Sequence, residues 1–210
     1  MIKPVDSKFM SDHSEGDHGL EAILDYELSW VLRMAADGDC KEKHPKLYYQ
    51  CRHILFKLLG IDNGKDIIIE KVHVWKQWKY IDLVADIYLV ENGVRTLHVL
   101  MTEDKAYTPM SIKQRDRYPE IVKEAYYNYP QYAEYRNNYQ LHKMLVTCFP
   151  PKPYNEGDYD GYKAYKEFLN GSDGWCVLSI EELPDWNVDE MTESDLFNDF
   201  WFNNWKRLIN

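Results

Sequence analysis

The sequence predicts an α/β protein in which a mixed central sheet is flanked by helices. Segments with apolar residues at helical spacing alternate with short apolar runs typical of buried strands. Asn92-Gly93 separates two such runs and strongly indicates a β-hairpin, because a type I′ turn needs positive φ at both central residues. A strand at 97–104, a crossover helix and a strand at 143–149 form a right-handed unit with parallel strands. The sheet therefore contains both antiparallel and parallel pairs.

Length and composition predict one globular domain with an appendage. The chain has 210 residues, of which 45% are hydrophobic. No segment approaches the roughly 20 apolar residues of a membrane span. The first 17 residues are polar and lack the apolar region of a signal peptide, and we expect them to be disordered. Four scattered cysteines without a C-x-x-C pattern indicate free thiols and a cytoplasmic location.

The net charge of −10 argues against a general nucleic-acid-binding protein. The charge is unevenly distributed, however. Residues 65–123 hold 10 Lys or Arg and 9 Asp or Glu, whereas residues 154–210 hold 4 and 13. The acidity therefore lies mainly in the C-terminal part of the chain.

Two helices are expected before the sheet. Apolar residues recur at helical spacing from Leu20 to about Ala36, and Gly38 follows as a stop signal. Pro45 suits the first turn of a second helix that runs to about Leu59. We interpret the second helix as scaffold.

The hairpin brings two acidic residues together. A first strand begins at 67–69 and continues towards Val74. If Asn92 and Gly93 form the turn, the numbers of paired residues sum to 185, and Asp82 lies opposite Glu103. Directly paired Cβ atoms are about 5 Å apart, which is close enough for two carboxylates to share one divalent cation. Lys105 lies roughly 7 Å further along the same face, at about 3.3 Å per residue.

Asp86 is the alternative first acid, because it points to the same face as Asp82. In the same register it pairs with Val99, four residues short of Glu103. We prefer Asp82, although a β-bulge would reverse this choice.

A helix over about 111–127 follows the hairpin. It carries Gln114 and Tyr118 four residues apart on one face, and Pro119 predicts a boundary or a kink. Beyond the strand at 143–149, the acidic segment 154–210 predicts a helix near 162–169, a strand at 175–180 and a final helix from Thr192. We expect this extension to pack on a core formed by residues 18–153.

These residues resemble the PD-(D/E)XK nuclease superfamily, and most closely a bacterial branch with the pattern I-D … E-N-K … Q-L-x-x-Y. Ile81-Asp82 matches the first motif, Glu103-Asp104-Lys105 the second, and Gln114 with Tyr118 the third. The chain departs from the pattern at Thr102, Asp104 and Arg115, where an aliphatic residue, Asn and Leu are usual. None of these changes removes a chemical group that the nuclease reaction of this superfamily needs.

The resemblance implies a restriction-endonuclease-like αβββαβ core and phosphodiester hydrolysis with Mg²⁺ or Mn²⁺. The implied metal ligands are Asp82, Glu103, a backbone carbonyl at Asp104, and Glu21 on the first helix, directly or through water. The resembling family carries a glutamate on its first helix, about seven residues before a run of the form L-S/A-W/Y-x-L. In this chain that run begins at Leu28, which points to Glu21. The resemblance gives Lys105 the task of orienting or deprotonating the attacking water, and Gln114 that of supporting the lysine or a phosphate oxygen.

The expected partner is nucleic acid, with DNA preferred to RNA. Aromatic residues interleave with Lys76 and Lys79, and such residues can stack on bases and hold phosphates. The remaining contact candidates lie on the predicted helix over 111–127: Lys113, Arg115, Arg117 and Tyr118. A homodimer through a sheet edge or the C-terminal helix is compatible with the sequence.

Two other classes of function stay open. In one, the fold is kept as a non-catalytic binding or regulatory module. In the other, the acidic C-terminal part imitates DNA and binds a basic protein.

Overall fold

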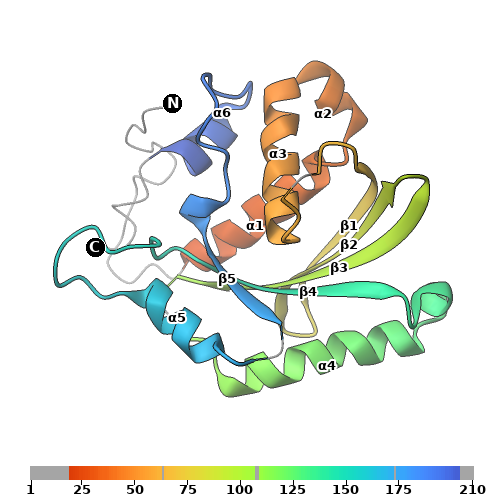
Figure 1. Cartoon of the computed structure of the whole chain (residues 1–210). Helices are drawn as coiled ribbons and strands as arrows, with labels where there is room; N and C mark the ends of the chain where they lie inside the picture. Colours follow the sequence, from red (N-terminus) through yellow and green to blue (C-terminus); the bar gives the residue numbers. More distant parts are fainter. Residues whose placement is uncertain (1–18, 63, 107–108, 173, 204–210) are drawn as a thin grey trace.

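The structure is a computed structural model of the whole chain, shown in Figure 1. It describes residues 19–62, 64–106, 109–172 and 174–203, and for residues 19–22 it describes the backbone alone. The tail expected at 1–17 lies outside the described residues.

A five-stranded mixed sheet forms the centre of the fold, as the sequence predicts. Its strands follow the order β1-β2-β3-β4-β5. The first two pairs are antiparallel, and β3–β4 and β4–β5 are parallel. The strands are β1 Ile68–Trp78, β2 Ile81–Glu91, β3 Val94–Lys105, β4 Tyr139–Thr147 and β5 Trp175–Ser179.

Helices cover both faces of the sheet (Figure 1). One face carries α1 Gly19–Met34 and α3 Pro45–Leu58, joined through the short α2 Gly38–Lys43. The other face carries α4 Ile112–Asn128 and α5 Gly161–Leu169. Two buried clusters match these layers, one around Leu28 and Leu55 and the other around Val99 and Val122.

The β2–β3 hairpin has the register expected from its turn. Glu91 pairs with Val94 across Asn92 and Gly93, and both turn residues have positive φ. The register holds without irregularity to the pair Leu83–Thr102. The only shift between β1 and β2 lies between Ile69 and Lys71, at the opposite end from Asp82.

Helix α4 spans the range that the sequence predicts, and of the two expectations for Pro119 it excludes the boundary. The helix continues through Pro119 to Asn128 rather than ending there. Its start is fixed by a capping box, in which the Ser111 side chain accepts from the Gln114 backbone N–H and the Gln114 side chain accepts from the Ser111 backbone N–H.

The C-terminal segment completes both the sheet and the core. It contributes β5, the short helix α6 Asp195–Phe197 and a π-helical turn over Asn198–Phe202. The final helix expected from Thr192 begins at Asp195 and continues as the π-helical turn to Phe202, and the residues beyond 203 lie outside the described part of the chain. Phe197, Phe200 and Trp201 are fully buried in the cluster that includes α1 and α3.

None of the helices that the structure describes is both long enough and apolar enough to span a bilayer.

Glu27 gives a test of the packing between α1 and the C-terminal segment. It lies on α1, is 6% exposed, and burial raises its pKa to about 7, with the nearby Trp201 indole opposing this in part. A carboxyl group with a raised folded-state pKa stabilises the fold fully below its unfolded pKa and loses that contribution as the pH rises through the folded value. We therefore predict that Glu27→Gln becomes increasingly stabilising relative to wild type between pH 5 and 8, by up to about 3 kcal/mol.

Urea denaturation at several pH values measures this difference. The matched control is Glu42→Gln, an exposed residue on α2, which should show no comparable trend. A difference between Glu27→Gln and wild type that stays constant with pH would contradict the prediction.

Candidate active site

Three charged side chains meet where β2 begins and β3 ends. Because the two strands are antiparallel, Asp82 comes next to the last residues of β3. The Lys105 ammonium nitrogen lies 2.7 Å from Glu103 Oε1 and 3.8 Å from Asp82 Oδ2. The backbone N–H of Asp104 donates to Asp82 Oδ2 at 2.9 Å, which ties the start of β2 to the end of β3. The structure thus brings together the two acids and the amine that the sequence analysis singled out.

Gln114 adds a fourth group from α4. Its side-chain oxygen accepts from the backbone N–H of Ser111 at 2.9 Å, and its Nε2 donates to Glu103 Oε1. The helix cap therefore fixes the direction of the amide, with the nitrogen facing the carboxylate. Tyr118 lies one turn later and contacts Gln114 through its hydroxyl.

Glu103 is more buried than Asp82, with only 1% of its surface exposed. Burial and, next, the negative charge of Asp82 raise the pKa of Glu103 to about 7, while Lys105 lowers it. Its Oε2 atom has no hydrogen-bond partner in the part of the chain that the structure describes. Glu103 thus lies within hydrogen-bonding reach of the Asp82 carboxyl, and its Oε2 atom is buried.

Asp104 points to the opposite face of the sheet. Its backbone carbonyl accepts from the Lys105 ammonium at 3.1 Å, so this expected metal ligand is engaged by the lysine in the structure. Its side chain is fully buried and lies within hydrogen-bonding reach of the Asp25 carboxyl on α1. Burial, and then the charge of Asp25, raises the pKa of Asp104 well above its usual value. A proton shared between the two carboxyl groups satisfies this contact, because two carboxylates have no donor.

The sequence analysis missed two residues that join these faces, Asp25 and Gln77. Gln77 Nε2 lies 3.1 Å from both Asp25 Oδ2 and Asp82 Oδ1, and so bridges the acid on α1 to the acid on β2. Asp25 gives a weak signal in the sequence, an acid next to the apolar stripe of the first helix at Leu24 and Leu28. Gln77 gives none, because its position depends on a backbone φ of +53° near the end of β1.

The position expected for Glu21 is one turn before Asp25 on α1. Its side chain lies outside the described residues, so its role stays a prediction.

Asp86 has a different environment from Asp82. Its carboxyl accepts hydrogen bonds from Tyr126 and, at 2.8 Å, from Tyr132, and it is 1% exposed. Desolvation raises the pKa of Asp86, and the two tyrosine hydroxyls oppose that effect. Asp86 therefore anchors the end of α4 and the 3-10 turn Pro130–Tyr135 to the sheet, four residues away from Asp82.

The expected nucleic-acid contacts lie in two places. At the end of the β1–β2 hairpin, the Lys76 ammonium lies over the Tyr26 ring, and Lys79 is exposed beside Trp78, 5.1 Å from its ring centroid. On α4, Lys113 and Arg117 are exposed.

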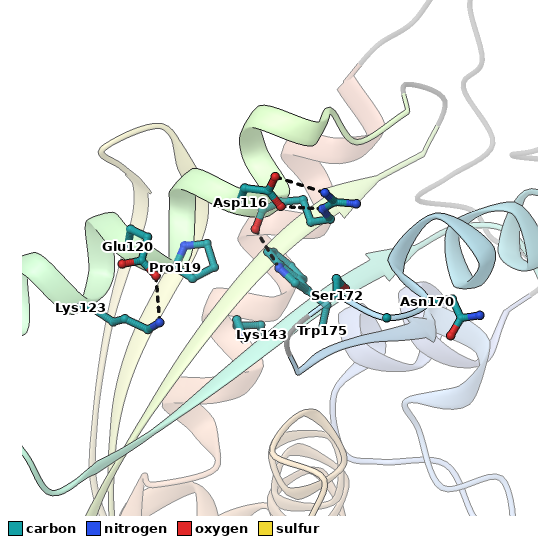
Figure 2. Close-up of a pocket in the computed structure, with 10 residues that line it drawn as sticks. Asp116, Pro119, Glu120, Lys123, Lys143, Asn170, Ser172 and Trp175 are labelled. Carbon is teal, nitrogen blue, oxygen red and sulfur yellow. Dashed lines mark hydrogen bonds and ion pairs between the residues drawn. The ribbon is translucent and has the colours of Figure 1, made fainter.

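Arg115 lies in a cavity of about 370 Å³ between α4 and the segment before β5. Figure 2 shows α4 side chains facing Lys143 and Trp175 across this cavity. Arg115 pairs with Asp116 at 2.6 Å, Lys123 pairs with Glu120 at 2.9 Å, and the Trp175 indole N–H donates to the Arg115 carbonyl. Because Arg115 and Lys123, the two cations that α4 contributes to this cavity, are paired with neighbouring acids, the cavity is polar without being strongly cationic.

The carboxylates at the strand ends fit a small, hard divalent cation. Among the described residues, no group of three or more His, Cys, Asp or Glu side chains could hold a metal ion. Mg²⁺ is nevertheless commonly bound by only one or two carboxylates, together with waters and substrate phosphates. Asp82 is partly exposed, and Glu103 offers a buried oxygen without a partner among the residues described, so this pair suits such a cation.

Comparison with protein-family models, with curated proteins and with solved structures gives no significant match. Any functional assignment therefore rests on the residues and their geometry.

The different environments of Asp82 and Asp86 can be tested by measuring the free energy of unfolding of two variants. Asp86→Ala leaves two buried tyrosine hydroxyls without their acceptor, and an unsatisfied buried polar group costs about 1–3 kcal/mol. We predict a loss of about 2–4 kcal/mol in the free energy of unfolding for Asp86→Ala. The matched variant Asp82→Ala should lose less, because water can reach that side chain, which is 20% exposed. Chemical denaturation of both variants measures the difference, and equal losses would contradict it.

Proposed function

We propose that the protein is a divalent-metal-dependent nuclease of the PD-(D/E)XK class, with DNA as its substrate. The order of elements supports this proposal, since three antiparallel strands, a crossover helix and a parallel strand follow one another as the resemblance implies, although α2 and α3 stand between the first helix and the strands. The five-stranded mixed sheet is in keeping with a restriction-endonuclease-like core.

One observation carries the proposal. Asp82, Glu103, Lys105 and Gln114 come from three different elements and converge at one edge of the sheet, within hydrogen-bonding and ion-pair distance. Buried charges are costly unless they are paired or bind a ligand. An acid pair with an adjacent ammonium is therefore an arrangement that a merely structural strand end does not require.

The residues divide the work of phosphodiester hydrolysis between them. Asp82 and Glu103 would hold a Mg²⁺ or Mn²⁺ ion, and Glu103 must be ionised to do so. Such a cation, when bound, supplies positive charge for the phosphate and lowers the pKa of a coordinated water. Lys105 places a second positive charge beside the phosphate and is positioned to orient the attacking water. Gln114 keeps the Glu103 carboxylate facing the site.

The exposed cations around this edge suit a nucleic-acid backbone. Lys113 and Arg117 lie on the solvent side of α4, on the helix that carries Gln114. Lys79 lies at the end of the hairpin that leads into Asp82, next to the aromatic ring of Trp78. Cations with neighbouring aromatic rings can contact both phosphates and bases.

Substitution of the acid and the amine tests the proposal. We predict that Glu103→Ala and Lys105→Ala each lower Mg²⁺- or Mn²⁺-dependent cleavage of DNA by about 100-fold or more, because each removes a group that contacts the reacting centre. A fluorescent oligonucleotide assay measures the rate. The matched controls are Glu91→Ala and Lys71→Ala, which are exposed and lie away from the site. Cleavage that survives both active-site substitutions would contradict the assignment.

Calorimetric titration with Mn²⁺ shows whether the protein has a metal-binding site, independently of whether it cleaves DNA. Wild-type protein should bind Mn²⁺ at millimolar concentration or below, and Asp82→Ala should weaken that binding. A wild-type chain that neither binds Mn²⁺ nor cleaves DNA would instead favour the non-catalytic binding module.

A further inference from the structure

A second cavity lies on the sheet face opposite Glu103. It has a volume of about 890 Å³ and is formed by the C-terminal half of α3, the loop that follows α3, and the last two strands. Met144 on β4 and Cys176 and Leu178 on β5 contribute to its lining, together with Phe56 and Ile61. Its volume falls within the range of cavities that bind small molecules, which are mostly apolar with a few placed polar groups.

The wall of this cavity is held in place by Arg52. The Arg52 guanidinium donates to the carbonyls of Gly64 at 3.0 Å and Ile67 at 2.9 Å, and it stacks 4.9 Å from the centroid of the Phe56 ring. These contacts fix the loop after α3 against the helix. On the other side, the Tyr49 hydroxyl donates to Asp185 at 2.6 Å, which sets the position of that ring. The cavity is therefore formed before any ligand binds.

The charged residues that line the cavity are mostly cations, and the acid Asp185 lies behind the lining residue Tyr49. Arg52, Lys57 and Lys65 line it, and Asp62 is the one acid among its lining residues. This local excess of positive charge contrasts with the net charge of −10 of the whole chain. Burial lowers the pKa of His53, which favours its neutral form and leaves the lysines and the arginine as the cations. An apolar floor with a cationic rim is complementary to an anion that has an apolar body.

We propose that this cavity binds a small organic anion, with an aromatic or aliphatic body against Phe56 and Leu178 and an anionic group at Lys57. This site lies across the sheet from the carboxylate pair and uses none of its residues. The proposal is therefore independent of the proposed nuclease activity.

Cys176 provides a direct probe of occupancy. All four cysteines are free thiols, and Cys40, Cys51 and Cys148 are buried, whereas Cys176 is exposed at the cavity. A maleimide reagent should therefore modify Cys176 first, as peptide mass spectrometry can verify. The probe ligand is 1-anilinonaphthalene-8-sulfonate, which combines an aromatic body with one negative charge. We expect it to slow the modification of Cys176 in proportion to its occupancy of the cavity.

Charge reversal at the rim tests the anion contact. Lys57→Glu should weaken the protection of Cys176 by about tenfold or more, the usual effect of losing one charged contact. The matched control Lys41→Glu changes the net charge equally, at an exposed position on α2, and should leave the protection unchanged. Unaltered protection in Lys57→Glu, or the absence of protection in wild type, would overturn the proposal.

Competition identifies the source of the natural anion. Displacement of the probe by AMP would assign the cavity to a nucleotide, and displacement by laurate would assign it to an acyl chain. Either outcome supports the proposal. A rate of Cys176 modification that falls with protein concentration alone, without any probe, would assign the surface to a second copy of the chain and would overturn the small-ligand proposal.

Discussion

The pairing of β2 with β3 is the constraint on which the rest of the candidate site depends. The two-residue turn at Asn92-Gly93 sets a register in which the start of one strand meets the end of the other. A slip by one residue would turn the side chain of Asp82 to the opposite face of the sheet. The N–H of Asp104 donating to Asp82 strengthens the pairing at the point where the ladder ends. Local turn chemistry therefore decides which acids face one another.

Holding charged groups at this edge costs free energy, and the structure offsets the cost with partners. Lys105 neutralises part of the charge of Glu103, and Gln114 donates a hydrogen bond to the same oxygen. The remaining oxygen of Glu103 has no partner among the described residues, and the pKa of this carboxyl is raised to about 7. Behind the sheet, the Asp25–Asp104 contact holds a second buried pair of acids. A site with unpaired buried oxygens is less stable than an apolar one, which is typical of positions kept for binding or chemistry.

Sequence patterns were sufficient to predict the parts of the structure that short-range rules determine. The hairpin register, the α4 position of Gln114 and the parallel β3–β4 pair follow from turn type, helical spacing and crossover rules. Asp25 and Gln77 could not be found in this way, because their contacts join segments about 50 residues apart and depend on a residue with positive φ. The separate role of Asp86 also required tertiary contacts, since Tyr126 and Tyr132 lie 40 and 46 residues further along the chain. The C-terminal aromatic residues indicated a helix that packs on the core, but not its start at Asp195 or its π-helical turn.

The central claim is that Asp82 and Glu103 together bind one divalent cation. Crystals soaked in MnCl₂ at pH 8, above the raised pKa of Glu103, test it most directly. The account predicts an anomalous difference peak between the two carboxylates, with the Lys105 ammonium displaced from its contact with Glu103. A map without a peak there, with Lys105 still paired to Glu103 at saturating Mn²⁺, would contradict it.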